Sequence, residues 1–289
     1  MIVVFGSINA DLIVPVARLP APGETVLGGD YTIAPGGKGA NQALAARRAG
    51  ADVMMIGAVG RDGFAEAALS LLRRDGVDLD LVATSSRPTG CATIAIDERG
   101  ENQIAVSSGA NLEVVATQVP DLRLGRQTTL VLQREVPAAE NAALIRRARA
   151  RGARVVMSVA PAGPIVPAQA EDIDIIIANE GEASASGLGS QPRPRQALIV
   201  TRGAHGVVAY LPNSGEIVAP ALPIEPVDTT GAGDTFAGVF AAGLDEGLPF
   251  ELALRRASAA AALACLAVGA QSAMPDRAAI DAAVARLSG

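Results

Sequence analysis

The feature that most constrains the fold is the alternation of short apolar runs with segments of helical periodicity along most of the chain. Ile2–Phe5 is a continuous apolar run, typical of a strand that is buried on both faces of a parallel sheet. Further strands are predicted at Val53–Val59, Leu130–Gln133, Arg154–Ser158, Ile173–Ala178, Ala197–Thr201 and Val207–Leu211. Strands that alternate with helices favour a mostly parallel central sheet covered on both faces, which is a three-layer α/β/α fold.

The helical segments between these strands carry recognisable end signals. Ala40–Ala49 follows two glycines and ends at Gly50, which predicts a helix with a glycine C-cap. The other predicted helices are Gly63–Arg74, Ala138–Arg151, Ala232–Leu244, Pro249–Ala267 and Asp276–Leu287. One connection differs, because Gly181–Gln196 has glycines and prolines spread through its second half. We expect the helix of that connection to be shortened or missing.

A second group of strand-like segments has no helix pattern between its members. It comprises Leu12–Val16, Glu24–Leu27, Tyr31–Ala34, Ala92–Asp97 and Asn102–Val106. The last two flank Glu98–Glu101 and predict a hairpin. We expect roughly residues 9–35 and 88–108 to form a small β-sheet lid. Residues 1–289 contain no internal repeat and no long linker, so a single domain with this lid is predicted.

Composition argues against several classes of function. Aromatic residues make up only 2% of the chain, the net charge is −6, and no long basic run occurs, so no nucleic-acid partner is expected. Two cysteines, Cys91 and Cys265, exclude a disulfide scaffold and favour a reduced, cytoplasmic setting. The Ala-rich stretch Ala257–Ala270 is too short to span a membrane, and the N-terminus lacks signal-peptide features. We therefore expect no membrane partner.

The strongest chemical signal is the segment Asp228–Phe236, in which an Ala-rich helix is predicted to begin. The small residues Gly231, Ala232 and Gly233 would let an anion approach the unpaired amides at the positive end of that helix. Asp234, in the first turn, would stand beside a phosphoryl group held there and could accept a hydroxyl proton. Taken alone, the short motif is equally compatible with an ordinary glycine loop and a favourable first-turn acid.

A second signal is the segment Gly36–Ala43, where two glycines, Lys38 and Asn41 precede or open another helix. Its backbone could lie against a polyhydroxylated ligand, with Asn41 both donating and accepting hydrogen bonds. The segment is not a Walker loop, because its glycines and lysine lack that spacing and no Ser or Thr follows the lysine. The alternative is a glycine turn before a helix.

These motifs resemble the ribokinase-like carbohydrate kinase family, closest to its ribokinases, over nearly the whole chain. The matching segments, in the order of the family, are Gly6–Asp11, Pro22–Thr25, Gly36–Ala43, Gly109–Asn111, Asn179–Glu182 and Asp228–Phe236. The resemblance implies ATP-dependent phosphorylation of a sugar hydroxyl, with D-ribose as the first candidate acceptor and D-ribose 5-phosphate as the product. It also implies Mg²⁺ and K⁺ as cofactors and a homodimer formed through the lid.

The resemblance further implies roles for individual positions. Asp234 matches the catalytic base, and Gly231, Ala232 and Gly233 match the anion hole. The positions that match sugar contacts are Asn9, Asp11, Gly37, Lys38, Asn41 and Glu135. The positions that match nucleotide contacts are Asn179, Thr201, Gly203 and Gly206. Glu182 matches an acid that holds Mg²⁺ through water, and Asp228 and Thr230 match the surroundings of K⁺.

Three departures from the family pattern leave details open. Ser158-Val159-Ala160-Pro161 stands where the family commonly has Asn-Pro-Ala-Pro, Ala237 stands where Asn is frequent, and Arg134 beside Glu135 is unusual. Two alternatives to ribose phosphorylation therefore remain. One is a kinase of a ketohexose, a deoxyribose or a nucleoside, and the other is a catalytically weak sugar-binding regulatory protein.

Overall fold

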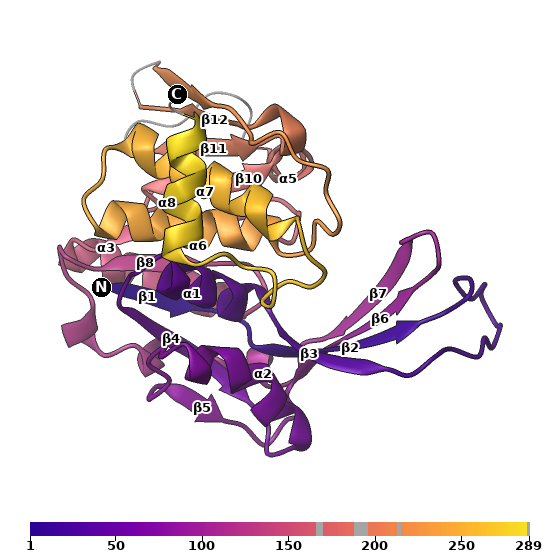
Figure 1. Ribbon diagram of the computed structural model, residues 1–289. Helices are drawn as coiled ribbons and strands as arrows, with labels where there is room; N and C mark the ends of the chain where they lie inside the picture. The colour runs from indigo at the N-terminus through magenta and orange to yellow at the C-terminus, as the bar shows by residue number, and fades with distance from the viewer. Residues whose placement is uncertain (166–169, 188–195, 213–214, 288–289) are drawn as a thin grey trace.

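The computed structural model describes residues 1–165, 170–187, 196–212 and 215–287. Within these residues, the main sheet has nine strands in the order β13-β12-β11-β10-β9-β8-β1-β4-β5 (Figure 1). Seven strands pair in parallel: β1 (Ile2–Phe5), β4 (Val53–Val59), β5 (Val82–Thr84), β8 (Thr129–Leu132), β9 (Arg154–Ser158), β10 (Ile175–Asn179) and β11 (Ala197–Thr201). At one end of the sheet, β12 (Val207–Tyr210) pairs antiparallel with β11, and the edge strand β13 (Glu216–Ala219) pairs antiparallel with β12.

Helices cover both faces of this sheet, because alternate strand residues point to opposite sides. Ile2 and Val4 of β1 face a core shared with α1 (Lys38–Arg48), α2 (Gly63–Arg74), α6 (Ala232–Asp245), α7 (Phe250–Ala264) and α8 (Arg277–Leu287). Val3 and Phe5 face a second core shared with α3 (Ala138–Arg151) and α5 (Glu180–Ser186). The predicted three-layer α/β/α fold is confirmed.

A smaller sheet extends away from the main body in Figure 1. Its strands are β3 (Thr32–Gly36), β2 (Asn9–Pro15), β6 (Gly90–Ile96) and β7 (Asn102–Ser107), in that order. β7 is exposed along its whole length, and the apolar side chains Leu27, Tyr31, Ile104 and Val106 are exposed as well. We call this second sheet, with the loop 16–31, the small sheet.

The predicted strand at Glu24–Leu27 is wrong. The chain turns there, since Glu24 N donates to Ala21 O and the Glu24 carboxylate accepts from Ala21 N and pairs with Arg18. A single bridge between Val16 and Gly28 is the nearest pairing. In the connection Gly181–Gln196, α5 is seven residues long and is followed by Gly187 in a left-handed conformation, while residues 188–195 lie outside the described part.

Close contact between α1 and α6 places the two motif-bearing helices side by side. A Cβ added at Gly238 of α6 would lie 2.4 Å from the carbonyl oxygen of Gln42 and 2.8 Å from Cβ of Ala45. Small residues at this contact therefore let the two backbones approach closely. As a result, the first turn of α1 lies beside the first turn of α6.

Candidate active site

Asp234 lies in the first turn of α6, directly after a turn that needs glycine. Gly231 is the N-cap residue with a φ of 76°, a left-handed conformation that glycine adopts without strain, and a Cβ there would meet Ala270 at 2.9 Å. The amide of Ala232 donates to Thr229 O at 3.3 Å, so it is partly used by the loop. The amides of Gly233 and Asp234 precede the first helical hydrogen bonds and can face an anion.

The Asp234 carboxylate is buried and accepts a hydrogen bond at each oxygen. Its exposed fraction is 7%; Asn41 Nδ2 donates to Oδ2 at 3.0 Å, and Gln42 Nε2 donates to Oδ1 at 2.9 Å. Burial raises the pKa of Asp234 above its ordinary value, and the nearby charge of Lys38 and these two amides act in the opposite direction. A base with a raised pKa beside an anion pocket is suited to accept a proton from an alcohol.

Asp11 and Glu135 bring two more acids close to Asp234. The pKa of Asp11 is raised to about 6, first by burial and then by the charges of Glu135 and Asp234. The Lys38 ammonium lies near Asp234 and Glu135, and its pKa is raised mainly by the charge of Asp234, against the effect of its own burial. The three acids form a polar site whose carboxylate oxygens can accept hydrogen bonds from several hydroxyl groups of one small ligand.

Hydrogen bonds fix the other predicted sugar-side residues. Glu135 Oε2 accepts from Ser7 Oγ at 2.5 Å and from the Lys38 amide at 3.1 Å. Asn9 Oδ1 accepts from Asn111 Nδ2 at 2.7 Å. Gly37, whose φ is 89°, has no room for a side chain, because a Cβ would lie 2.7 Å from Asn9 N. The six residues that sequence reasoning assigned to the sugar therefore come from β2, the start of α1 and the segment after β8, and meet beside the carboxyl ends of the central strands.

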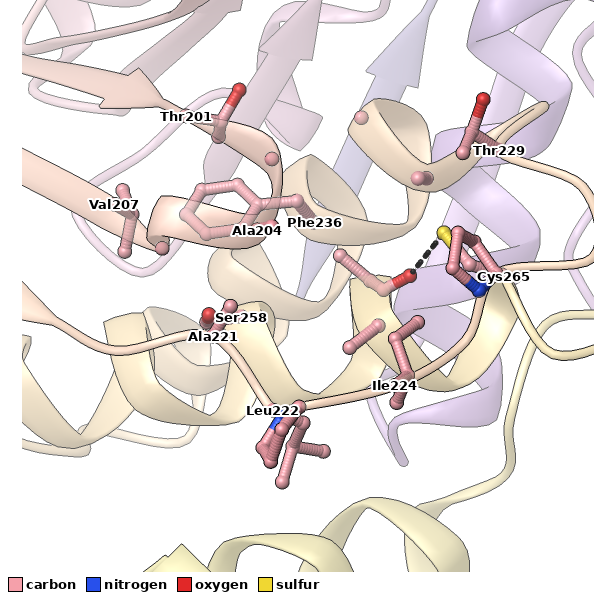
Figure 2. A pocket seen from close by; sticks show the side chains of 18 residues that line it. Thr201, Ala204, Val207, Ala221, Leu222, Ile224, Thr229, Phe236, Ser258 and Cys265 are labelled. Atoms are coloured by element: carbon pink, nitrogen blue, oxygen red, sulfur yellow. Dashed lines mark hydrogen bonds between the residues drawn. The ribbon is translucent and has the colours of Figure 1, made fainter.

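A cavity of about 420 Å³ borders the Gly231–Asp234 turn, because Ala232 and Gly233 are among its lining residues. Figure 2 shows the side chains around this cavity. It is lined by Thr201, Gly203 and Gly206, three of the four predicted nucleotide residues, and by Ala232 and Gly233 of the predicted anion hole. The remaining wall is mostly apolar and comes from Ala221–Pro226, Phe236 and α7. Cys265 closes one end, where its Sγ donates to Ala261 O at 3.2 Å. Sequence reasoning missed the wall formed by Ala221–Ile224 and Pro226, an apolar stretch without helix or strand periodicity.

Asn179, the fourth predicted nucleotide residue, caps α5 together with Glu182. Asn179 Oδ1 accepts from Glu182 N at 2.8 Å, and Glu182 Oε2 accepts from Asn179 N at 2.9 Å. This reciprocal arrangement fixes the Glu182 side chain while using one of its carboxylate oxygens. Glu182 also lies near enough for its charge to raise the pKa of Lys38.

Asp228 and Thr230 shape the loop before the anion hole. Asp228 Oδ1 accepts from Thr230 N at 2.9 Å, and Oδ2 accepts from Gly269 N at 2.8 Å. Partial burial alone would raise the pKa of Asp228, but hydrogen bonds from Thr230 and Gly269 outweigh it and hold the pKa below its ordinary value. Asp228 is therefore an ionised carboxylate that joins this loop to the turn after α7.

The departures from the family pattern have distinct surroundings. The Arg134 guanidinium donates to the carbonyls of Pro161, Gly163 and Pro164 at 2.8–3.1 Å, so it holds the loop after β9 and does not enter the acid cluster. Ser158 is buried at the end of β9, and Ala237 is buried among core residues of α6. Sequence reasoning also missed Gln133 and Gln271, two buried glutamines that bond to Gln42 and Asn41.

The pfkB family of carbohydrate kinases matches residues 1–277. A ribokinase from Bacillus subtilis is 37% identical over 287 residues, which is 96% of both chains. A ribokinase from Arabidopsis thaliana, solved in complex with ribose and ATP, superposes with a TM-score of 0.87 at 32% identity and 98% coverage of both chains. A ribokinase structure from Thermotoga maritima gives a TM-score of 0.89 at 29% identity, with 99% coverage of both.

Proposed function

This chain belongs to the pfkB family of carbohydrate kinases, and we propose that it transfers the γ-phosphoryl group of ATP to D-ribose, giving D-ribose 5-phosphate. The observation that carries the proposal is the position of buried Asp234, between the Asp11–Glu135 cluster and the 420 Å³ cavity. Relatives named as ribokinases, one of them solved with ribose and ATP, favour ribose as acceptor. Residues 1–289 would act as one kinase domain with the small sheet as its lid.

In the proposed reaction, Asp234 accepts the proton of the sugar hydroxyl while that oxygen attacks the γ-phosphorus. The bond from this phosphorus to the bridging oxygen breaks, and ADP leaves with the electron pair. The charge that develops on the transferred group would be stabilised by the Gly231–Gly233 turn and by the Lys38 ammonium. Asp11, Asn9, Asn41 and Glu135 would hold the remaining hydroxyls, since carboxylate and amide oxygens make strong bonds to them.

The nucleotide would lie in the cavity beyond the turn. Thr201, Gly203 and Gly206 would border it, and the apolar wall with Phe236 would cover the base. Asn179 does not line this cavity, and it would act on the nucleotide through the helix cap that it forms with Glu182. Closure of the small sheet over the sugar would exclude water and so limit hydrolysis of ATP.

Two cations would assist. Mg²⁺ normally keeps several waters and needs only one or two carboxylates beside the phosphates, and Glu182, held by the Asn179 cap, fits that need. Bound there, Mg²⁺ would neutralise phosphate charge. For K⁺, the ionised Asp228 and the neighbouring Thr230 offer oxygen ligands behind the anion hole. Replacement of K⁺ by a bulky organic cation should lower activity, and unchanged activity would refute this role.

The assembly and location of the protein complete the proposal. A homodimer formed through the small sheet is supported by its exposed apolar side chains and by the unpaired edge of β7. A reduced, cytoplasmic location is supported by the two free cysteines, Cys91 and Cys265. Among the described helices, none has both the length and the apolar character that a membrane crossing requires.

Two measurements test the function. Phosphate transfer to a panel of pentoses, ketohexoses and nucleosides should give the highest kcat/KM with D-ribose, and a rank for ribose among the poorest acceptors would sink the substrate assignment.

Asp234→Asn should lower kcat roughly 10²–10⁴-fold, as expected for loss of a general base. Turnover by Asp234→Asn equal to that of the wild type would show that Asp234 is not the base, whereas an inactive wild-type protein would favour a regulatory role.

A further inference from the structure

Two chains of amide side chains end on the two oxygens of Asp234. Gln42 Nε2 donates to Oδ1 and Asn41 Nδ2 donates to Oδ2. Behind them, Gln133 Nε2 donates to Gln42 Oε1 at 2.9 Å, and Gln271 Nε2 donates to Asn41 Oδ1 at 3.1 Å. We call these the Gln133 arm and the Gln271 arm. They reach one carboxylate from α1, from the residue after β8 and from the turn after α7.

Both arms are held rigidly. Gln42 and Gln133 have exposed fractions of 0%, and Gln271 has 1%. The backbone at the outer end of each arm is anchored as well, since Asn141 Nδ2 donates to Gln133 O at 2.6 Å and Arg48 Nη1 donates to Gln271 O at 2.7 Å. The four amide groups therefore have little freedom to move away from Asp234.

The hydrogen-bond direction in both arms follows from the acid at their centre. An ionised carboxylate can only accept, so Asn41 and Gln42 must turn their NH₂ groups toward Asp234 and their oxygens outward. Those oxygens require donors, which Gln133 and Gln271 supply. The same direction leaves the Oε1 atoms of Gln133 and Gln271 buried without a hydrogen-bond partner in the described part of the chain. Buried acceptors are normally paired, so this shared feature calls for an explanation.

We propose that Gln133 and Gln271 are positioning residues, which lock the amides of Gln42 and Asn41 in the orientation that favours an ionised, correctly aimed Asp234. Neither glutamine hydrogen-bonds to Asp234. Gln133 acts through the amide of Gln42, and Gln271 acts through the amide of Asn41. The proposal rests on the proposed function, because it assumes that Asp234 is the base. The unpaired Oε1 atoms then result from a network in which every donor points inward.

The charges around Asp234 show why neutral donors matter here. Lys38 of α1 favours the ionised form of Asp234. The charges of Glu135, after β8, and of Asp11, on β2, oppose it, and burial opposes it as well. The two arms add donors without adding charge. If Asp234 were protonated, its O–H group would face an N–H group unless one arm turned round. The locked arms therefore disfavour protonation before the substrate hydroxyl arrives.

The test is the pH dependence of kcat/KM for the sugar. Gln133→Met and Gln271→Met keep most of the side-chain volume but remove the donor that locks the neighbouring amide. The pKa of Asp234 should then rise, so the acid limb, the fall of kcat/KM at low pH, should move upward by about one pH unit in each variant. Gln133→Glu should move it further, although it preserves the shape. An ionised carboxylate at that position would attract the NH₂ group of Gln42 and turn its oxygen toward Asp234. Activity lost at low pH should largely return above the shifted limb.

A matched control is Gln196→Met. Gln196 is also buried, and its Nε2 donates to Ala170 O and Ile173 O, away from Asp234. It should lower thermal stability but leave the acid limb in place. If the limbs of Gln133→Met and Gln271→Met coincide with that of the wild type while Asp234→Asn is inactive, the positioning role alone is wrong. If Asp234→Asn is fully active, the proposed function itself fails. Where only one of the two Met variants folds, an unshifted acid limb in that variant overturns the positioning role of its arm.

Discussion

At the scale of single residues, Asp11 shows how the proposed sugar site opposes stability. Its pKa is raised to about 6 by burial and by two neighbouring acids. A carboxyl group whose pKa is higher in the folded than in the unfolded state favours folding when protonated. Its contribution is therefore present at low pH and is lost as the pH rises through about 6. At neutral pH the protein carries an ionised, partly buried acid beside two other acids, and hydrogen bonds from a bound sugar would stabilise it.

We predict that Asp11→Asn raises the free energy of unfolding at pH 8 by about 1–2 kcal/mol, because the unfavourable charge is removed. The gain should vanish near pH 4, where Asp11 is protonated in the wild type. The same variant should raise the KM for the sugar. Urea unfolding at the two pH values and sugar kinetics check both parts. A variant less stable than the wild type at pH 8 would contradict the role of burial.

The sequence identified the site residues that lie in compact motifs, and it missed those whose role depends on distant contacts. Asp234, Asn41 and Lys38 stand in short glycine-rich segments whose chemistry can be recognised locally. Gln133 directly follows the apolar strand β8, and nothing local shows that it meets Gln42, which is 91 residues away. Only the fold brings such amides together, so the arms behind Asp234 could not be predicted.

At the scale of helices and strands, the contact between α1 and α6 sets the geometry of the site. Asn41 and Gln42 can reach Asp234 only because Gly238 lets α6 lie against the backbone of α1. The long elements with clear periodicity, such as α3 and β4, were predicted with their bounds. The three-residue strand β5 and the edge strand β13 were not, because short strands are set by pairing partners more than by their own sequence.

We predict that Gly238→Ala lowers the free energy of unfolding by about 1–3 kcal/mol, because the new methyl group would overlap the Gln42 carbonyl. It should also lower kcat, since the donors on α1 would be pushed away from Asp234. Gly63→Ala is the control, because a Cβ there has nothing within 4 Å. Denaturant unfolding and steady-state kinetics compare the two, and equal stability of both variants would argue against a tight helix contact.

At the scale of the whole molecule, the small sheet links the sugar site to the proposed dimer. Asp11 on β2 pairs with Ala92 on β6, which pairs with Val106 on β7, so these three side chains share one face of the sheet. Ile104 and Val106, each 55% exposed, lie on that same face. This apolar face also carries Asp11, which is proposed to bind the sugar. It is therefore suited both to cover the substrate and to contact a second copy of the chain.

We predict that Ile104→Lys combined with Val106→Lys weakens the dimer, because two charges would be placed in an apolar contact. Sedimentation velocity at several protein concentrations should show a shift toward the monomer. Gln103→Lys is the control, since Gln103 is exposed on the same strand but points to the opposite face. A wild-type protein that sediments as a monomer throughout would contradict the proposed assembly.

The position of Tyr31 within the small sheet has a practical consequence for following this protein in solution. The chain contains two tyrosines and no tryptophan, so its ultraviolet emission is weak and comes from few places. Tyr31 is 64% exposed near β3, whereas Tyr210 lies on β12 of the main sheet. A tryptophan introduced in place of Tyr31 would therefore be the sole indole fluorophore. Stopped-flow emission from it would follow the small sheet in real time, without an attached dye.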